Sequence, residues 1–210
     1  MTIEAVVFDL GNVVVEWNPE AYYDARIGRA AREAMFAETG IHAVNLQIDE
    51  GAPFRDTIYA LAERFPHWAD DIRQWHDDQF AMTQPVIWPT LDLIGALKAR
   101  GVPVFALSNW GDESFDRAVA HYPFLGGFDR AYVSGKLKMK KPDPAIYAHV
   151  EADCGIAPGR LLFTDDRAEN IRVAAARGWQ VHLFDGARGL EQRLRNEGLI
   201  AADVTPDRRQ

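Results

Sequence analysis

The chain has 210 residues, 48% hydrophobic and 26% charged, which is ordinary for a globular protein and favours one domain or one domain with an insertion. Its formal net charge of −8 argues against a general nucleic-acid-binding surface, and no apolar run approaches the ~20 residues that span a bilayer. Because Cys154 is the only cysteine and the first residues lack the basic region of a signal peptide, we expect a cytoplasmic protein without disulfides.

Five short apolar stretches predict buried strands, since they lack the polar alternation of a half-exposed sheet. They are residues 5–8, 102–107, 130–133, 161–164 and 180–184. Helical patterns separate the later stretches: Asp143 and Pro144 indicate a helix start, and Gly155 follows its end. A second helix at 168–177 ends in the same way at Gly178. This alternation of strands and helices predicts an α/β fold with a doubly wound parallel sheet.

A long segment separates the first two predicted strands, and it is too long for a single crossover connection. It contains no convincing strand, but it has helical patterns at residues 21–39, 54–64 and 68–82. We therefore expect an inserted helical subdomain at 17–89, a core made of 1–16 and 90–203, and a C-terminal tail at 204–210.

Polar side chains follow three of the predicted strands, at the edge where parallel sheets bind ligands. The first strand ends at Asp9, the second at Ser108 and Asn109, and the fourth at Asp165 and Asp166. A single carboxylate at a strand end is unremarkable, because Asp often forms turns and caps. Three such strand ends converge on one rim of the sheet, so the sequence predicts a functional site there.

These groups suit phosphoryl transfer through a covalent aspartyl phosphate. Asp9 is ionised at neutral pH and can act as the nucleophile without a general base. A Mg²⁺ ion held by hard oxygen ligands offsets the repulsion between this carboxylate and a phosphate dianion. The predicted ligands are Asp9, Asp165, Asp166 and the backbone carbonyl of Gly11, which has no side chain to obstruct the approach.

Three further residues can stabilise phosphoryl oxygens. Ser108 and Asn109 offer hydrogen-bond donors, and Lys141 offers a point charge after the third strand. Pro142 biases the backbone of Lys141 toward an extended conformation, which gives the lysine side chain a fixed starting direction. We therefore count Ser108 and Lys141 with Asp9 as catalytic candidates.

Four short motifs occur in the order 8-FDLGNV-13, 107-LSN-109, 140-KKPDPAIY-147 and 163-FTDDRAEN-170. Each is weak alone, but together they cover nearly the whole chain and resemble the haloacid dehalogenase-like hydrolase superfamily. The resemblance implies a Rossmann-like core with a helical cap inserted after the first motif. It also implies a nucleophile at Asp9, phosphate contacts at Ser108 and Lys141, and metal carboxylates at Asp165 and Asp166.

The resemblance also ranks the remaining candidates. Alignment of the last motif makes Asp166 the better direct metal ligand, with Asp165 acting through water. Asn12 and Asn109 match positions that contact the substrate. Apart from the resemblance, Trp17 at the start of the insertion and Trp110 on the rim of the sheet are candidates to face the substrate.

Position 11 departs from the family pattern. Most phosphatases of this family carry a second Asp two residues after the nucleophile, which protonates the leaving group and then activates water, whereas this chain has Gly11. General acid–base catalysis contributes roughly 10²–10⁴-fold to the reaction rate, so a phosphatase without this Asp needs another proton carrier or a good leaving group. Glu16 is a candidate for the displaced acid, although a turn residue is the simpler interpretation.

Three functions fit these observations. The first is a Mg²⁺-dependent phosphatase of small phosphate monoesters, sugar phosphates above all, because the FDLGNV motif resembles a subgroup that includes phosphatases acting on glucose 1-phosphate. The second is a 2-haloacid dehalogenase, whose halide leaves without protonation; that branch works without a metal, so the acidic pair favours the phosphatase. The third is a phosphate-binding regulatory protein without turnover. The expected partner is a small phosphorylated metabolite, with neither nucleic acid nor membrane, and the oligomeric state stays open.

Overall fold

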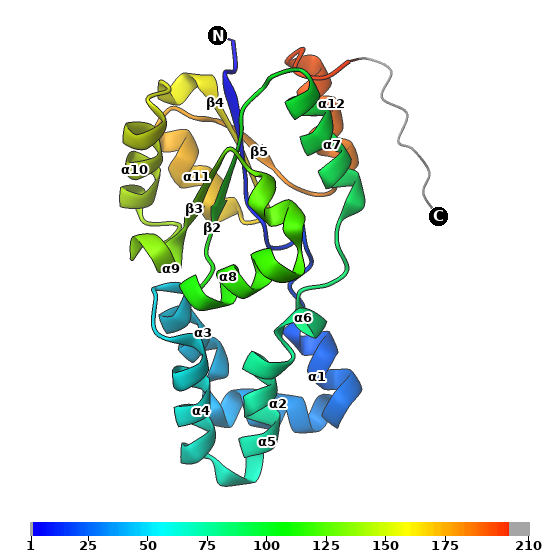
Figure 1. Ribbon diagram of the computed structural model, residues 1–210, viewed down its shortest axis with the longest axis vertical. Coiled ribbons are helices and arrows are strands. Elements are labelled where there is room, and N and C mark those ends of the chain that lie inside the picture. Colours follow the sequence, from blue (N-terminus) through cyan, green and yellow to red (C-terminus); the bar gives the residue numbers. More distant parts are fainter. Residues whose placement is uncertain (1, 202–210) are drawn as a thin grey trace.

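A five-stranded parallel sheet forms the centre of the computed structural model, which describes residues 2–201 (Figure 1). The predicted tail at 204–210 lies outside the described residues. The strand order is β3-β2-β1-β4-β5. The strands are β1 (Ala5–Phe8), β2 (Val104–Ser108), β3 (Arg130–Val133), β4 (Leu161–Asp165) and β5 (Gln180–Leu183). The predicted α/β fold with a Rossmann-like parallel sheet is therefore confirmed, and β1 and β3 have the predicted bounds.

Alternating side chains of the central strands enter two separate hydrophobic clusters, one on each face of the sheet. Val6 and Phe8 pack with α7 (Trp88–Ala99), α8 (Asp112–His121) and α12 (Ala187–Asn196). Ala5 and Val7 pack with α10 (Pro144–Cys154) and α11 (Ala168–Ala176) on the other face. Because β1 is covered on both faces and paired on both edges, the residue that follows it is held at the centre of the sheet.

The helix signals after the third strand are confirmed. The Asp143 side chain caps α10 by accepting a hydrogen bond of 2.8 Å from the Ala145 N–H, and Gly155 ends the helix with φ 69°. The short helix α9 (Ser134–Leu137) follows β3 directly, and two 3₁₀ helices precede β3 and β4, at Pro123–Gly127 and Pro158–Arg160.

Six helices form the segment between β1 and α7. They are α1 (Pro19–Ile27), α2 (Arg29–Thr39), α3 (Ile41–Asp49), α4 (Phe54–Arg64), α5 (Ala69–Asp77) and α6 (Gln79–Met82), with a 3₁₀ turn at Pro66–Trp68. The predicted helix at 21–39 is interrupted at Gly28, where φ is 81°, because positive φ does not continue a right-handed helix. The sequence patterns also missed α3.

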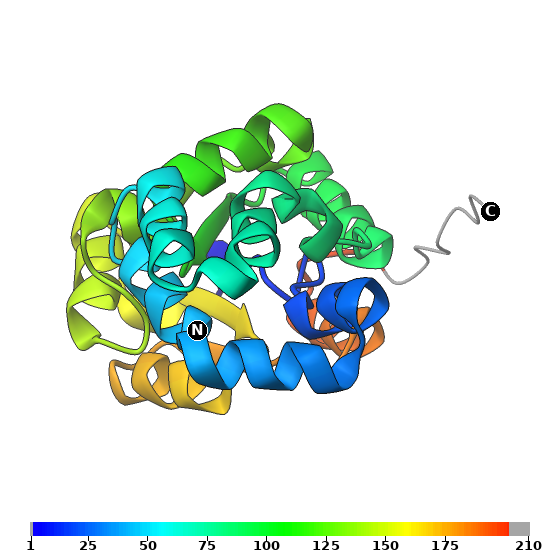
Figure 2. The same ribbon diagram turned by 90° about the horizontal axis from the view of Figure 1, so that it is seen from below.

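We call α1–α6 the inserted helices. They lie beyond the carboxyl ends of the strands (Figure 1), and the view from below shows them in front of the sheet (Figure 2). They have a hydrophobic cluster of their own, which includes the fully buried Tyr23, Met35, Ile58 and Trp75. Within residues 2–201, every helix is too short or too polar to cross a lipid bilayer.

The two connections between the sheet and the inserted helices run side by side. Val15 on the way out pairs with Val86 on the way back, and the Glu16 N–H donates a 3.0 Å hydrogen bond to the Pro85 carbonyl. The inserted helices therefore join the sheet through one narrow double connection, while α3 also contacts α9 at the rim of the sheet.

Candidate active site

Asp9 directly follows β1 and lies at the middle of the sheet edge. It is 7% exposed, and its Oδ1 accepts a 2.7 Å hydrogen bond from the Leu10 N–H. The chain passes from β1 to β2 and β3 on one side before it returns to β4 on the other. Open α/β sheets bind ligands at this topological switch point, and Asp9 and the residues after β4 lie there.

The ammonium group of Lys141 lies between two carboxylates. Lys141 Nζ is 2.9 Å from Asp9 Oδ1 and 2.6 Å from Asp165 Oδ2, and Lys141 is 2% exposed. Burial alone would lower the pKa of Lys141, but the carboxylates of Asp9 and Asp165 outweigh it and raise that pKa above its ordinary value. Lys141 is therefore a fixed positive charge at the end of the sheet.

Asn109 positions Lys141 through its backbone. The Asn109 amide donates a 2.8 Å hydrogen bond to the Lys141 carbonyl, and its Oδ1 accepts another of 2.8 Å from the Lys141 N–H. Asn109 lines the cavity, and these contacts also make it a positioning residue for Lys141, while its role as a phosphate donor stays a prediction. Ser108, at the end of β2, is 2% exposed and lines the same cavity.

Three carboxylates meet beside this lysine. Oxygen atoms of Asp9, Asp165 and Asp166 all lie within 4.8 Å of one another. Burial raises the pKa of Asp9 to about 7; Lys141 opposes this rise, and the charges of Asp165 and Asp166 add to it. Without a bound cation Asp9 is therefore only partly ionised at neutral pH, in contrast to the expectation from its ordinary pKa. Burial also raises the pKa of Asp166. A divalent cation would relieve this surplus of negative charge, and carboxylate oxygens are the ligands that Mg²⁺ prefers.

The two residues of the acidic pair, Asp165 and Asp166, differ in how many hydrogen bonds their side chains accept. Asp165 is fully buried, and its oxygens accept hydrogen bonds from the Asn170 amide, the Arg167 N–H and Lys141. Asp166 lines the cavity and accepts a 3.2 Å hydrogen bond from the Asn12 amide. The donor set thus fits a cation bound through Asp9 and Asp166, with Asp165 holding the lysine and the loop in place.

The turn after Asp9 owes its shape to Asn12. Asn12 adopts φ 57°, and its Oδ1 accepts a 2.9 Å hydrogen bond from the Trp17 N–H. Asn tolerates this left-handed conformation better than most residues. Gly11 lies outside it, and a Cβ atom placed there would meet only the Trp17 Cβ, at 4.0 Å. Glycine at position 11 is therefore not required by the backbone.

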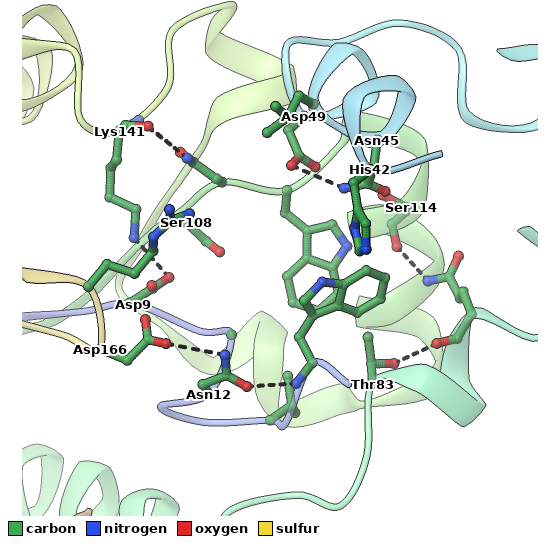
Figure 3. Close-up of a pocket in the computed structure, with 18 of the residues that line it drawn as sticks. Asp9, Asn12, His42, Asn45, Asp49, Thr83, Ser108, Ser114, Lys141 and Asp166 are labelled. Atoms are coloured by element: carbon green, nitrogen blue, oxygen red, sulfur yellow. Dashed lines mark hydrogen bonds and ion pairs between the residues drawn. The ribbon is translucent and has the colours of Figure 1, made fainter. Parts of the chain in front are cut away.

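A cavity of about 330 Å³ lies between the sheet edge and the inserted helices (Figure 3). The predicted residues that line it are Asp9, Gly11, Asn12, Trp17, Ser108, Asn109, Trp110, Lys141 and Asp166. Asp165 lies directly behind them in the carboxylate cluster. Glu16 does not line this cavity; it faces a separate surface depression beside Asn18.

Sequence reasoning missed the wall that the inserted helices supply. This wall includes His42, Asn45 and Asp49 of α3, together with Trp75 of α5. Trp17 meets Trp75 edge to face, with ring centroids 5.6 Å apart. A polar face on α3 was the one available signal, and it was lost because that helix itself was not predicted.

Comparison with known proteins found a family model and several relatives that match most of the chain. Residues 3–178 match the family model "haloacid dehalogenase-like hydrolase". The sesquiterpene phosphatase astK of Aspergillus oryzae is 26% identical over 186 residues, which are 88% of this chain and 91% of that protein. The D-ribitol-5-phosphate phosphatase of Bacteroides thetaiotaomicron is 24% identical over 207 residues, covering 91% of this chain and 97% of that protein.

A solved structure shares the fold over most of the chain. The haloacid dehalogenase family enzyme bt-2542 of Bacteroides thetaiotaomicron, in complex with magnesium and inorganic phosphate, matches with a TM-score of 0.66 and 25% identity. The match covers 88% of this chain and 95% of that one. Bacterial (S)-2-haloacid dehalogenases also match, over 37% to 53% of this chain.

Proposed function

This chain belongs to the haloacid dehalogenase-like hydrolase family, and we propose that it is a Mg²⁺-dependent phosphatase of small phosphate monoesters, sugar phosphates above all. One observation carries the proposal: Asp9, Lys141 and Asp166 converge at the end of the sheet, inside a cavity closed by the inserted helices. Phosphatases among the relatives, and magnesium and phosphate in a structural neighbour, support it.

Asp9 is the proposed nucleophile. Its Oδ1 is held by the Leu10 N–H and by Lys141, which leaves Oδ2 to attack phosphorus. The new bond joins Asp9 to phosphorus while the bond from phosphorus to the ester oxygen breaks, giving an aspartyl phosphate and an alkoxide that becomes the alcohol when it takes up a proton. Water then attacks the same phosphorus, releases inorganic phosphate and restores the Asp9 carboxylate.

Mg²⁺ would be held by Asp9, Asp166 and the Gly11 carbonyl, and when bound it supplies positive charge that reduces repulsion between Asp9 and the phosphate dianion. Lys141 keeps one end of Asp9 fixed and adds positive charge where the phosphoryl group lies. The Ser108 hydroxyl can donate to a phosphoryl oxygen from the end of the neighbouring strand.

The inserted helices, with the surrounding residues 17–89, act in this proposal as a cap. They supply the wall of the cavity opposite the sheet, so they exclude bulk water and select the substrate. A volume of about 330 Å³ suits a small ligand. Trp17 and Trp110 are proposed to face the organic part of the substrate. The cytoplasmic location of the protein stays a prediction from the sequence.

A 2-haloacid dehalogenase and a phosphate-binding regulatory protein are the two alternative functions. Halide release from a 2-haloacid requires the nucleophile but not the surplus of carboxylates, and the acidic cluster of Asp9, Asp165 and Asp166 therefore favours phosphate chemistry. A regulatory protein that binds phosphate without turnover would use the same cavity.

The test is phosphate release from a panel of sugar and alkyl phosphates, with Mg²⁺ and with EDTA, for wild type and Asp9→Asn. We expect wild-type activity that EDTA removes and that Asp9→Asn lacks. Chloride release from a 2-chloro acid without phosphatase activity would assign the dehalogenase function. No turnover, together with stabilisation by inorganic phosphate, would assign the binding function.

A further inference from the structure

The groups proposed above include no proton donor for the leaving group, because position 11 is glycine. Among the described residues that line the cavity, the carboxyl groups belong to Asp9, Asp49 and Asp166. Asp9 is the proposed nucleophile and Asp166 the proposed metal ligand, which leaves Asp49 without a role. His42 also lines the cavity, but its side chain is 50% exposed and lies 3.2 Å from Glu20.

Asp49 is the last residue of α3, and Figure 3 shows its carboxyl group on the wall that the inserted helices form, facing the interior. The hydroxyl of Ser134, a fully buried residue, donates a 2.6 Å hydrogen bond to the Asp49 carbonyl oxygen. Ser134 follows β3 directly, at the same sheet edge as Asp9. This contact fixes the backbone of Asp49 relative to the sheet.

The position of Asp49 matches the direction in which the leaving group departs. When Asp9 attacks phosphorus, the ester oxygen leaves on the opposite side, because attacking and leaving oxygens are roughly in line. Asp9 lies at the carboxyl end of β1, and the inserted helices lie beyond that end (Figure 1). The leaving oxygen therefore points toward the helices that carry Asp49.

A chain of hydrogen bonds sets the orientation of this carboxyl group. The indole Nε1–H of the fully buried Trp75 donates to Asn45 Oδ1 at 2.9 Å, so the Asn45 amide nitrogen must face the other way. That nitrogen donates a 3.2 Å hydrogen bond to Asp49 Oδ2. Oδ1 of Asp49 is the oxygen left to face a ligand.

The surroundings of Asp49 favour its protonated form near neutral pH. Burial raises the pKa of Asp49 to about 7; Lys140 and the hydrogen bond from Asn45 oppose this rise, and the charge of Glu50 adds to it. Lys140 is itself ion-paired with Glu50, and Lys138 is turned to the Gly51 carbonyl, at 3.1 Å. No cation thus makes a direct ion pair with the Asp49 carboxylate in the described part of the chain.

We propose that Asp49 is the general acid and general base of this enzyme, in the place of the carboxylate that position 11 lacks. The inference rests on the proposed phosphatase function. In the first step the Asp49 carboxyl group gives its proton to the ester oxygen as the bond from that oxygen to phosphorus breaks, so the alcohol leaves neutral and Asp49 becomes a carboxylate.

The second step returns the proton. Water takes the place of the departed alcohol, on the side of phosphorus that faces Asp49. The Asp49 carboxylate accepts a proton from this water while the water oxygen bonds to phosphorus and the bond from phosphorus to Asp9 breaks. Inorganic phosphate leaves, Asp9 is again a carboxylate and Asp49 is again protonated, so protons and charge balance over the cycle.

The experiment compares Asp49→Asn with wild type on two substrates: the alkyl phosphate that wild type hydrolyses fastest, and 4-nitrophenyl phosphate, whose leaving group is stable without protonation. Asparagine keeps the shape and can still accept from Asn45, so the fold is expected to persist, which circular dichroism and thermal melting check. kcat/KM reports the step that forms the aspartyl phosphate.

We expect kcat/KM of Asp49→Asn to fall by about 10²–10⁴-fold on the alkyl phosphate, the usual worth of general acid–base catalysis, and to stay close to wild type on 4-nitrophenyl phosphate. Equal falls on both substrates, or a loss confined to KM, would overturn the proposal in favour of a structural or binding role. No fall on either would also overturn it. If wild type hydrolyses neither ester, the phosphatase function itself fails.

A pH profile gives a second readout that a structural role would not move. On the alkyl phosphate, the ratio of wild-type to Asp49→Asn kcat/KM should fall as the pH rises through about 7, because the proton donor is lost from the wild type alone. Asp56→Asn is the matched control, since its side chain is 82% exposed on α4 and lies outside the cavity, and it should behave as wild type. A ratio that is constant with pH would overturn the assignment of the acid.

Discussion

The ammonium group of Lys141 lies 2.6 Å from Asp165 Oδ2, and both side chains are almost completely buried. Asp165 also accepts hydrogen bonds from Asn170 and from the Arg167 N–H, so it is held by groups of the protein itself. A buried charge with this many donors is a structural anchor for the lysine as well as part of a candidate metal site.

Lys141→Met should lower the free energy of unfolding by about 3–5 kcal/mol, because it leaves the carboxylates of Asp9 and Asp165 buried without their positive partner. Urea unfolding at neutral pH measures the change. Lys136→Met, which removes a partly exposed partner of Asp116, should change stability by less than about 1 kcal/mol. Similar small changes in both variants would contradict the anchoring role of Lys141.

Asp166→Asn should abolish stabilisation by Mg²⁺ without weakening the metal-free protein. In the folded state the pKa of Asp166 is raised, so its ionised form is unfavourable there and neutral asparagine removes a repulsion. Thermal melting across a Mg²⁺ titration should show a rising Tm for wild type and a flat one for the variant. A Tm of Asp166→Asn that still rises with Mg²⁺ would exclude Asp166 as a metal ligand.

Much of the fold followed from the sequence because the central strands β1, β2 and β4 are buried on both faces, although the edge strands β3 and β5 are partly exposed and not buried as predicted. Apolar runs such as 5–8 and 161–164 therefore mark the strands directly, and Gly155 marks a helix end through its positive φ. The inserted helices were harder to predict. Residues 41–49 carry His42, Asn45 and Asp49 on the face toward the cavity, so their polar pattern follows the site and not a buried stripe.

The contrast between strands and inserted helices also explains which residues of the site could be predicted from the sequence. Strand ends are brought together by the sheet, so Asp9, Ser108 and Asp166 could be grouped from their positions alone. Asp49 and Trp75 reach the cavity through the packing of separate helices, which no local pattern reveals. The detailed contacts also depend on packing: no sequence pattern showed that the Asn109 amide pairs with the backbone of Lys141.

Glu151→Gln should destabilise the fold by about 1.5 kcal/mol at neutral pH and leave kcat/KM unchanged. The Glu151 carboxylate of α10 accepts hydrogen bonds of 2.8 and 2.7 Å from Arg177 and one of 2.7 Å from the Trp179 indole, and it lies outside the cavity. These contacts join α10 to the end of α11.

The effect of Glu151→Gln should depend on pH in a defined direction. The hydrogen bond from Arg177 lowers the pKa of Glu151 below its ordinary value of 4.5 in the folded state. The stabilisation is therefore complete above pH 4.5 and is lost as the pH falls through the lower folded-state pKa. Denaturant unfolding of both proteins should show a gap that closes in acid; a gap that widens there would contradict this sign.

Gly11→Asp should restore a proton donor to Asp49→Asn. A Cβ at position 11 meets only the Trp17 Cβ at 4.0 Å, and the backbone there is not left-handed, so the substitution should fold. The new carboxyl group would face the same cavity as Asp9, two residues away. We expect the double variant to recover activity on alkyl phosphates more than on sugar 1-phosphates, whose leaving group needs less help, while Gly11→Asp alone should stay close to wild type because Asp49 already supplies the proton. Gly11→Ala controls for bulk and should give no recovery. Equal losses on both substrate classes in Gly11→Asp would instead mean that the missing side chain serves the approach of the Gly11 backbone to the metal.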